Sequence, residues 1–212
     1  MLIQARETPP RSSRGIRVLI AAVVIALLPV PAIADTPMAT VADTVDAVLH
    51  ALQSGDVSEE AKMRRVKNII SEHFDFRAMS SRVLATNWRH ATKKQRNRFS
   101  SLFKELLSNT YWLKISGYKN ETVEYVGESR RGEKLATVKT LIKTDTVDIP
   151  VDYKMYRKDD GKWYAYDVVI EQVSLVRNYR GSFQQMVRDS GIDGLIAQLE
   201  TKVARSSLPA QN

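Results

Sequence analysis

The sequence predicts an α+β protein in which helices near both ends of the chain cover a curved antiparallel sheet. Apolar residues recur at helical spacing from residue 38 to about residue 117, alternate with polar residues between 121 and 170, and return to helical spacing after 173. Apolar residues make up 43% of the chain and charged residues 26%, which is typical of a globular protein and excludes wholesale disorder. We expect about six helices on a sheet of four strands or slightly more.

The first half of the chain carries the start signals of four helices. A first helix is expected over Met38–Gln53, where valine and leucine recur every three or four residues. Ser58, which precedes two glutamates, predicts the N-cap of a second helix, and Asp75 predicts that of a short third helix. Thr92 and Gln95 form a capping box, which opens the longest periodic run in the chain.

The segment from 121 to 170 is expected to form a meander. Turn signals at 131–132, 144–145 and 160–161 divide it into four strands of hairpin length. Pro150 has no amide hydrogen to donate to a sheet, so it predicts an edge position or a bulge at which the sheet curves. After this block, two helical stripes meet at Gly191.

The N-terminal 34 residues are predicted to be a cleaved signal peptide of the Sec type. Four arginines and one glutamate precede an apolar run of eleven residues, VLIAAVVIALL. A membrane-spanning helix needs about 20 apolar residues, so the run is too short to span. Ala32 and Ala34 form an A-x-A cleavage signal ahead of Asp35. Residues 35–212 then form a single domain, and the alternative is an uncleaved N-terminal anchor.

The charge and the cysteine content restrict the possible compartments and classes of partner. The chain has 32 basic and 24 acidic residues, a net charge of +8, and removal of the signal peptide leaves 28 and 23, a net charge of +5. The absence of cysteine excludes disulfides, Cys-ligated metal and a lipidated N-terminal cysteine. We expect a soluble, monomeric protein of a Gram-negative periplasm, whose positive charge faces lipid headgroups or an acidic protein rather than nucleic acid.

The sequence offers little for catalysis. No two of the three histidines, His50, His73 and His90, have the spacing of a helical metal pair, and the common serine-hydrolase, P-loop and dinucleotide motifs do not occur. Asp148 and Asp152 share a strand face, but that face is the one directed to solvent. We therefore expect no metal, no cofactor and no enzymatic activity.

Two sets of residues are candidates for binding. A basic cluster where the long helix begins forms either a solvated face or a docking patch for an anionic partner or headgroup. It comprises Arg89, His90, Lys93, Lys94, Arg96 and Arg98, and the docking candidates among these are Arg89, Lys93, Lys94 and Arg96. An inner strand face and the helices above it are candidates for the lining of an apolar cavity. These residues are Val147, Ile149, Val151, Tyr153, Met155, Tyr166, Val168 and Ile170 on the sheet, with Met79, Leu84, Phe99 and Phe103 on the helices.

Two long blocks resemble a known family. FDFRAMSSRVLATNWRHATKKQRNRFSSLFKELLSNTY, from Phe74 to Tyr111, and YAYDVVIEQVSLVRNYRGSFQQMVRDSGIDGLIAQLE, from Tyr164 to Glu200, resemble the MlaC family of periplasmic phospholipid-binding proteins, also called the toluene-tolerance family. The chain departs from the family at Ala85, where a glycine is expected, and at Gln172, where a smaller residue is common. Neither departure removes a chemical group.

The resemblance implies a twisted antiparallel sheet related to the nuclear-transport-factor cone, with an apolar cavity for acyl chains. It also implies a carrier that shuttles glycerophospholipid between an outer-membrane lipoprotein–porin complex and an inner-membrane ABC transporter with a lipid-binding subunit, and so maintains outer-membrane lipid asymmetry. Three alternatives stay open: a carrier of another lipid such as a hopanoid, an envelope enzyme of a cone-shaped fold acting on a small hydrophobic substrate, and a ligand-free adaptor that uses the basic cluster.

Overall fold

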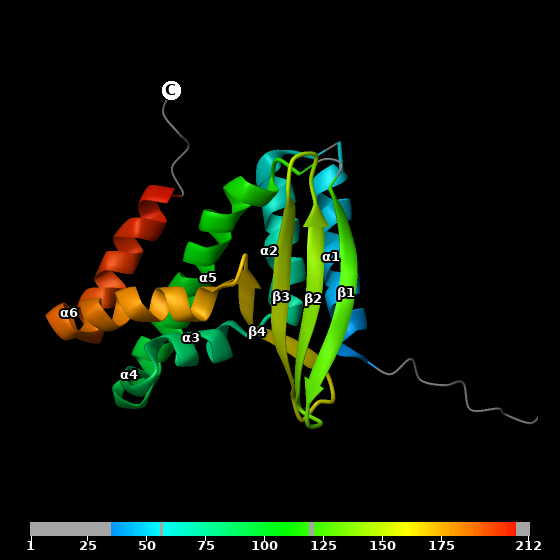
Figure 1. Ribbon diagram of the computed structural model, residues 1–212. Helices are drawn as coiled ribbons and strands as arrows, with labels where there is room; N and C mark the ends of the chain where they lie inside the picture. Colours follow the sequence, from blue (N-terminus) through cyan, green and yellow to red (C-terminus); the bar gives the residue numbers. More distant parts are fainter. Residues whose placement is uncertain (1–34, 56, 119–120, 207–212) are drawn as a thin grey trace, which may run out of the picture. The chain divides into compact units, whose positions relative to one another are not determined.

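The structure, a computed structural model, describes residues 35–55, 57–118 and 121–206 (Figure 1). The predicted signal peptide lies outside the described residues, and so does the C-terminal tail from residue 207. The elements follow in the order α1 (Pro37–Gln53), α2 (Glu59–His73), α3 (Phe76–Leu84), α4 (Thr86–His90), α5 (Lys93–Ile115), β1 (Thr122–Arg131), β2 (Leu135–Lys143), β3 (Asp148–Arg157), β4 (Trp163–Ile170), β5 (Val173–Ser174) and α6 (Leu175–Ser206).

The strands form one antiparallel sheet in the order β1-β2-β3-β4-β5, each strand pairing with the next along the chain. Short turns make this order possible, and Gly132 and Gly161 take the positive φ that two of the turns require, at +66° and +83°. The α+β class and the antiparallel sheet are confirmed, and the fifth strand is the two-residue β5.

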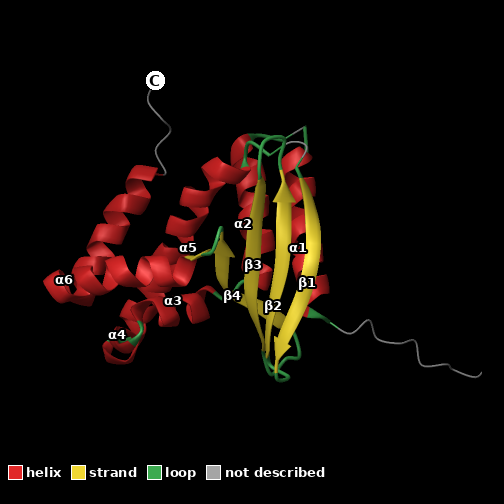
Figure 2. Ribbon diagram, in the orientation of Figure 1, coloured by secondary structure: helices red, strands yellow, loops and turns green. Residues whose placement is uncertain are grey.

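The helices gather on one face of the sheet and beyond its β4 side. In Figures 1 and 2, α1 and α2 lie behind β1, β2 and β3, while α3, α5 and α6 lie on the side of β4. Three groups of buried residues follow this division. One joins α3, α5 and α6 to β3 and β4, a second joins α1 to the strands, and a third joins α1 and α2 to α5. No helix in the described part of the chain combines the length and apolar content that a membrane span needs.

The helices begin where the capping residues predict. The side chains of Ser58 and Asp75 accept hydrogen bonds from Ala61 N and Ala78 N. Thr92 and Gln95 make both bonds of the capping box, since Gln95 N donates to Thr92 Oγ1 at 3.2 Å and Thr92 N donates to Gln95 Oε1 at 2.9 Å. These bonds satisfy amide groups that have no acceptor inside their own helix.

The expectation for Pro150 is wrong. It lies in β3, the third of five strands, opposite Leu141, and not at an edge or a bulge. The sheet tolerates it because the carbonyl of Pro150 faces the end of β4, where it accepts from Glu171 N at 3.0 Å. In an antiparallel strand the N–H and C=O groups of one residue point toward the same neighbouring strand. The amide hydrogen that Pro150 lacks would therefore point past Ile170, the last residue of β4. The actual bulges are at Val126 in β1 and Tyr166 in β4.

Ala85 has a backbone conformation that suits glycine. It joins α3 to α4 with φ +50° and ψ −119°, a region that L-residues avoid because Cβ approaches the backbone. We expect Ala85→Gly to raise the free energy of unfolding by about 1 kcal/mol, since relief of strain exceeds the added entropy of the unfolded chain. Urea unfolding measures the change. The matched control is Ala47→Gly at an exposed position of α1, which should lower stability by about 1 kcal/mol. A loss of stability in both variants would contradict the prediction.

Candidate functional site

The larger of two cavities lies between the inner face of the sheet and the helices, with a volume of about 630 Å³. This volume is within the usual range of about 300–1,000 Å³ for small-molecule sites. The wall is mainly aliphatic and aromatic. Its apolar residues are Met63, Val66 and Ile70 of α2, Phe74, Phe76 and Met79 around the start of α3, Leu107, Tyr111, Trp112, Ile115 and Tyr118 of α5 and its end, Ile142, Ile149, Val151, Tyr153, Val168 and Ile170 of the sheet, and Val173 and Leu175.

Polar groups line a part of this cavity that reaches water. Lys114, Glu171 and Asn178 line it and are exposed. Lys67 also lines it, but its ammonium group is held by Glu105 at 2.9 Å and by Asn109 Oδ1 at 3.3 Å. Exposed polar residues beside an apolar interior give the cavity a wet mouth and a dry body, the arrangement that an amphiphilic ligand requires.

A smaller cavity, of about 160 Å³, lies against α1. Seven of its lining residues come from α1 and include Val45, Val48 and Leu49. His73 and Glu121 are the ionisable groups of its wall besides tyrosine. The remaining wall is formed by apolar residues of α2, α5 and the sheet.

Seven of the twelve residues predicted to line a cavity do line one. Met79, Ile149, Val151, Tyr153, Val168 and Ile170 line the larger cavity, while Met155, like Tyr153, lines the smaller one. Strand alternation places the β3 members on one face, as the sequence predicts. That these residues contact a lipid remains a prediction.

Val147 does not line either described cavity. The strand begins one residue later, at Asp148, so Val147 lies in the β2–β3 turn with 58% of its surface exposed. Its carbonyl accepts from Thr144 N at 3.2 Å, which closes the turn. In the sequence, the alternation of apolar and polar residues in β3 extends back to Val147. The turn takes Val147 out of the strand, so its side chain does not lie on the sheet face.

Leu84, Phe99 and Phe103 belong to the close-packed interior and not to the lining of either described cavity. All three are at most 1% exposed. The rings of Phe99 and Phe103 stack with centroids 5.8 Å apart, and Phe183 of α6 meets both edge-on at 5.8 and 5.9 Å. Ring packing of this kind fills space between α5 and α6. Direction toward the interior therefore does not distinguish a core residue from a lining residue.

Tyr166 is displaced from the cavity by the β4 bulge. Lys154 pairs with Asp167 and Met155 with Ala165, so Tyr166 is the extra residue, and simple alternation fails there. Its ring lies 4.1 Å from the guanidinium carbon of Arg82 and 6.0 Å from the ring of Tyr156. Tyr166 therefore takes part in a cation–π contact with α3 instead of lining either described cavity.

The sequence analysis missed the cavity stripe of α5. Ser108, Tyr111, Ile115 and Tyr118 line the larger cavity at spacings of three and four residues. This spacing is visible in the sequence, but it was obscured by the stronger phenylalanine and leucine stripe earlier in the same helix. Burial raises the pKa of Tyr111, Tyr118 and Tyr153, in the last case to about 12, so these phenols are neutral at pH 7.

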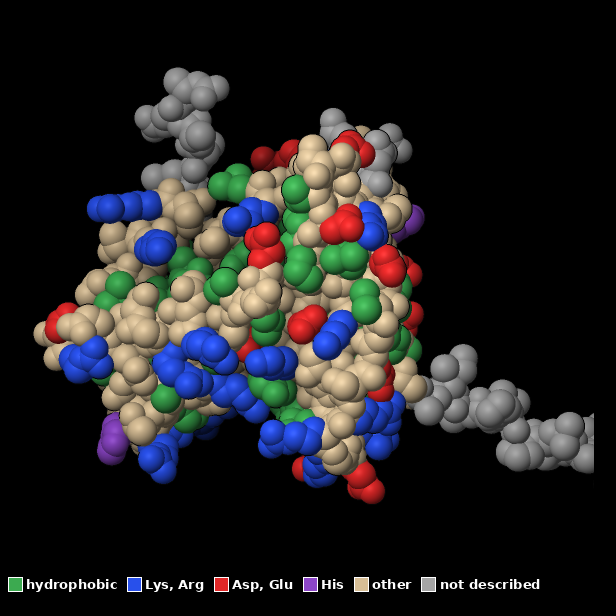
Figure 3. All heavy atoms as spheres, viewed as in Figure 1, with side chains coloured by type: hydrophobic (Ala, Val, Ile, Leu, Met, Phe, Trp, Pro, Cys, Tyr) green, Lys and Arg blue, Asp and Glu red, His purple; other side chains and the backbone are tan. Residues whose placement is uncertain are grey.

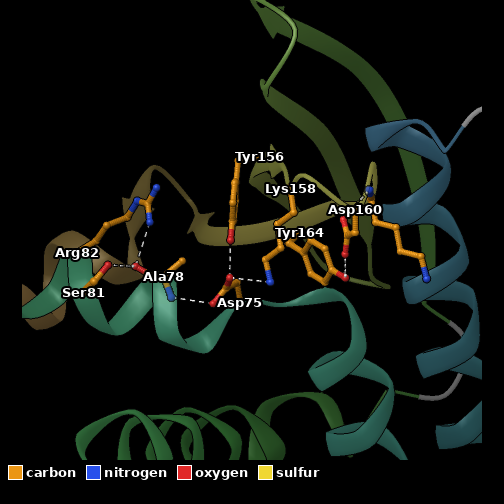
Figure 4. A network of polar contacts seen from close by, with 9 residues as sticks. Asp75, Ala78, Ser81, Arg82, Tyr156, Lys158, Asp160 and Tyr164 are labelled. Carbon is orange, nitrogen blue, oxygen red and sulfur yellow. Dashed lines mark hydrogen bonds and ion pairs between the residues drawn. The ribbon is translucent and has the colours of Figure 1, made fainter. Parts of the chain in front are cut away.

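A polar network holds the α2–α3 corner that contributes Phe74 and Phe76 to the cavity wall (Figure 4). The carboxylate of Asp75 accepts from Ala78 N at 2.8 Å, from the hydroxyl of Tyr156 and from the ammonium of Lys158 at 2.9 Å. Burial alone would raise the pKa of Asp75, but these three donors outweigh it and hold the pKa below its usual value. The corner is thus tied to the end of β3 by a charged group.

The basic cluster is only partly available for docking. Arg89, Lys93 and Lys94 are exposed around the α4–α5 corner. The guanidinium of Arg96 instead donates to the carbonyl oxygens of Trp88 at 2.8 Å and Arg89 at 3.0 Å, and so caps α4. Figure 3 shows Lys and Arg side chains along the lower part of the visible face. Docking at Arg89, Lys93, Lys94 and Arg96 remains a prediction.

Within the described residues, no group of three or more His, Asp or Glu side chains is arranged to hold a metal ion.

A helix-covered antiparallel sheet with an apolar cavity and a wet mouth defines a class of proteins that enclose an apolar or amphiphilic ligand. Comparison with known proteins then gives the family. The family model described as MlaC protein matches residues 42–201, and the chain belongs to this family.

Individual relatives are distant but cover most of the chain. The intermembrane phospholipid transport system binding protein MlaC of Haemophilus influenzae is 24% identical over 183 residues, which is 82% of this chain and 86% of the relative. A solved structure of a phospholipid-binding protein from Ralstonia solanacearum, in complex with a phospholipid, superposes with a TM-score of 0.74 at 22% identity. It covers 81% of this chain and 98% of its own and supports the same fold.

Proposed function

We propose that the protein is a soluble periplasmic carrier that binds a glycerophospholipid in the larger cavity and moves it between the outer and inner membranes. The observation that carries the proposal is the cavity of about 630 Å³, apolar in its body and polar where Lys114, Glu171 and Asn178 meet water. The apolar character of the body matches acyl chains, although its side chains must repack to enclose two full-length chains, and a charged or zwitterionic headgroup matches the mouth. Family membership supports the same ligand class.

The energetics explain why such a carrier is needed. Two acyl chains with about 32 methylene-scale groups, at about 0.8 kcal/mol each, represent about 25 kcal/mol of transfer free energy from apolar surroundings to water. Unassisted passage through water is therefore negligible. A carrier lowers this barrier by replacing the membrane interior with its own apolar wall, and it needs no catalytic group for that task.

Partners and compartment are part of the proposal. The relative from Haemophilus influenzae is described as the binding protein of an intermembrane phospholipid transport system. We expect this protein to receive and deliver lipid at an outer-membrane lipoprotein–porin complex and at an inner-membrane ABC transporter with a lipid-binding subunit. Cleavage after Ala34 would release it into the periplasm.

Mass spectrometry tests the ligand directly. Protein purified without detergent from a bacterial host is expected to carry phospholipid at close to one molecule per chain, and the delipidated protein is expected to extract phospholipid from vesicles. Recovery of a hopanoid in place of phospholipid would change the ligand. The absence of any lipid from both preparations would contradict the proposed function. Turnover of a small hydrophobic substrate, lost on His73→Ala, would instead favour an enzyme.

A further inference from the structure

The two cavities share one wall. Six residues line both of them: Ile70, Phe74, Ile115, Tyr118, Ile142 and Tyr153. Because the same side chains face both spaces, the wall is one side chain thick. All six are large and apolar or aromatic, and none carries a charge at neutral pH. Only their side-chain conformations and sizes keep the two spaces apart.

Tyr153 marks the boundary along the sheet. Three successive inward residues of β3 pass from one cavity to the other: Val151 lines the larger cavity only, Tyr153 lines both, and Met155 lines the smaller cavity only. Phe74 reaches the same place from the opposite side, at the C-terminal end of α2. The rings of Phe74 and Tyr153 meet edge-on, with centroids 6.5 Å apart and an interplanar angle of 83°.

Backbone contacts hold the main chain of both residues in place. Phe74 pairs with Ala165 of β4 in a β-bridge, and Phe74 N donates to Ile70 O at 2.9 Å. Tyr153 lies opposite Val138 of β2 and Val168 of β4, so it is central in the sheet and paired on both sides. The partition is therefore built from well-anchored residues, and the neighbouring Asp75 network tethers its helical side.

We infer that Tyr153, together with Phe74, limits how far an acyl chain reaches into the protein and so determines the chain length that the carrier accepts. This inference rests on the proposed function. The smaller cavity, at about 160 Å³, is close to the volume of an engineered apolar cavity that holds benzene, which corresponds to about six carbon atoms. Joining the two spaces would therefore admit chains longer by about four to six carbons.

Competition between lipids of different chain length tests the inference. Delipidated protein is incubated with vesicles containing equal amounts of phosphatidylcholines that differ only in the length of their saturated chains, and the bound lipids are quantified by mass spectrometry. In Tyr153→Leu, the preferred chain should lengthen by about four to six carbons. The ratio of long to short chains should rise at least tenfold over the unchanged protein.

Two matched variants distinguish the loss of the wall between the two cavities from a general increase in cavity volume. Tyr111→Leu adds a similar volume to the larger cavity without joining it to the smaller one, so its ratio of long to short chains should rise less than that of Tyr153→Leu. In Tyr153→Leu combined with Val48→Phe, the added ring fills the smaller cavity, which Val48 lines, and the preference should return toward shorter chains. Phe74→Leu changes the other side of the partition and serves if Tyr153→Leu does not fold.

The outcomes are distinguishable. An unchanged distribution in folded Tyr153→Leu or Phe74→Leu, with lipid still bound, overturns the inference and leaves the proposed function intact. An equal shift in Tyr111→Leu also overturns it, because total volume would then decide the chain length. Failure of the unchanged protein to bind any phosphatidylcholine or co-purified lipid contradicts the proposed function itself.

Discussion

Asp167→Ala is expected to lower the free energy of unfolding by about 3 kcal/mol. Asp167 is 4% exposed, and its carboxylate accepts from the hydroxyl of Ser174 at 2.6 Å and from Val176 N at 3.0 Å. Ser174 in turn accepts from Arg177 N at 3.1 Å, so the two residues together cap the start of α6. Alanine would leave a buried hydroxyl and a buried amide without this acceptor, at about 1–3 kcal/mol each.

The matched control for this change is Asp148→Ala. Asp148 is exposed and pairs with Lys143 at 2.6 Å, with half of its own side chain in water. Surface ion pairs contribute about 0–1 kcal/mol, so this variant should stay close to the unchanged protein in urea unfolding. Asp167→Asn keeps one acceptor and should fall between the two. Equal stability of Asp167→Ala and Asp148→Ala would show that the buried carboxylate does not stabilise α6.

Ile149→Trp is expected to weaken phospholipid binding by roughly 100-fold. Ile149 lines the larger cavity and is half-buried, so a larger ring at this position occupies space that acyl chains would use. Exclusion of about four methylene groups, at about 0.8 kcal/mol each, costs about 3 kcal/mol of binding free energy. Extraction of labelled phospholipid from vesicles, measured over a range of protein concentrations, gives the change in affinity.

Val147→Trp is the control for the cavity prediction. Val147 lies two residues earlier, exposed in the β2–β3 turn, and the same substitution there leaves the cavity volume unchanged. Binding should match that of the unchanged protein, and thermal unfolding should confirm that both variants are folded. Equal binding by the two variants would indicate that the ligand does not occupy this cavity.

Local signals in the sequence were sufficient to predict most of the elements. The caps at Ser58, Asp75 and Thr92 depend on side chains that bond to amides three residues away, and strand alternation requires only a regular backbone. The failures at Val147 and Tyr166 have a common cause. In each case a turn or a bulge interrupts the regular backbone: the turn signalled at residues 144–145 extends to Val147, and no residue type marks the bulge at Tyr166.

The candidate site was harder to predict because its boundaries depend on distant packing. Phe99 and Phe103 point inward like lining residues, but Phe183, about 80 residues further along the chain, fills the space beside them. Asp167 was missed for a related reason. A carboxylate in an apolar strand is explained only when the following hairpin brings Ser174 and Val176 back to it.

The position of α5 has a consequence for how the protein changes volume. Its first half packs with α3 and α6 through Phe99 and Phe103, and its second half packs with α1 and α2 through Trp112. One uninterrupted helix of 23 residues therefore links the two helical groups on either side of the larger cavity. The groups cannot separate without breaking that helix or its packing. The two helical groups should therefore keep their relative positions in the empty and loaded proteins, and rotation of side chains such as Tyr111 should contribute to expansion around a guest.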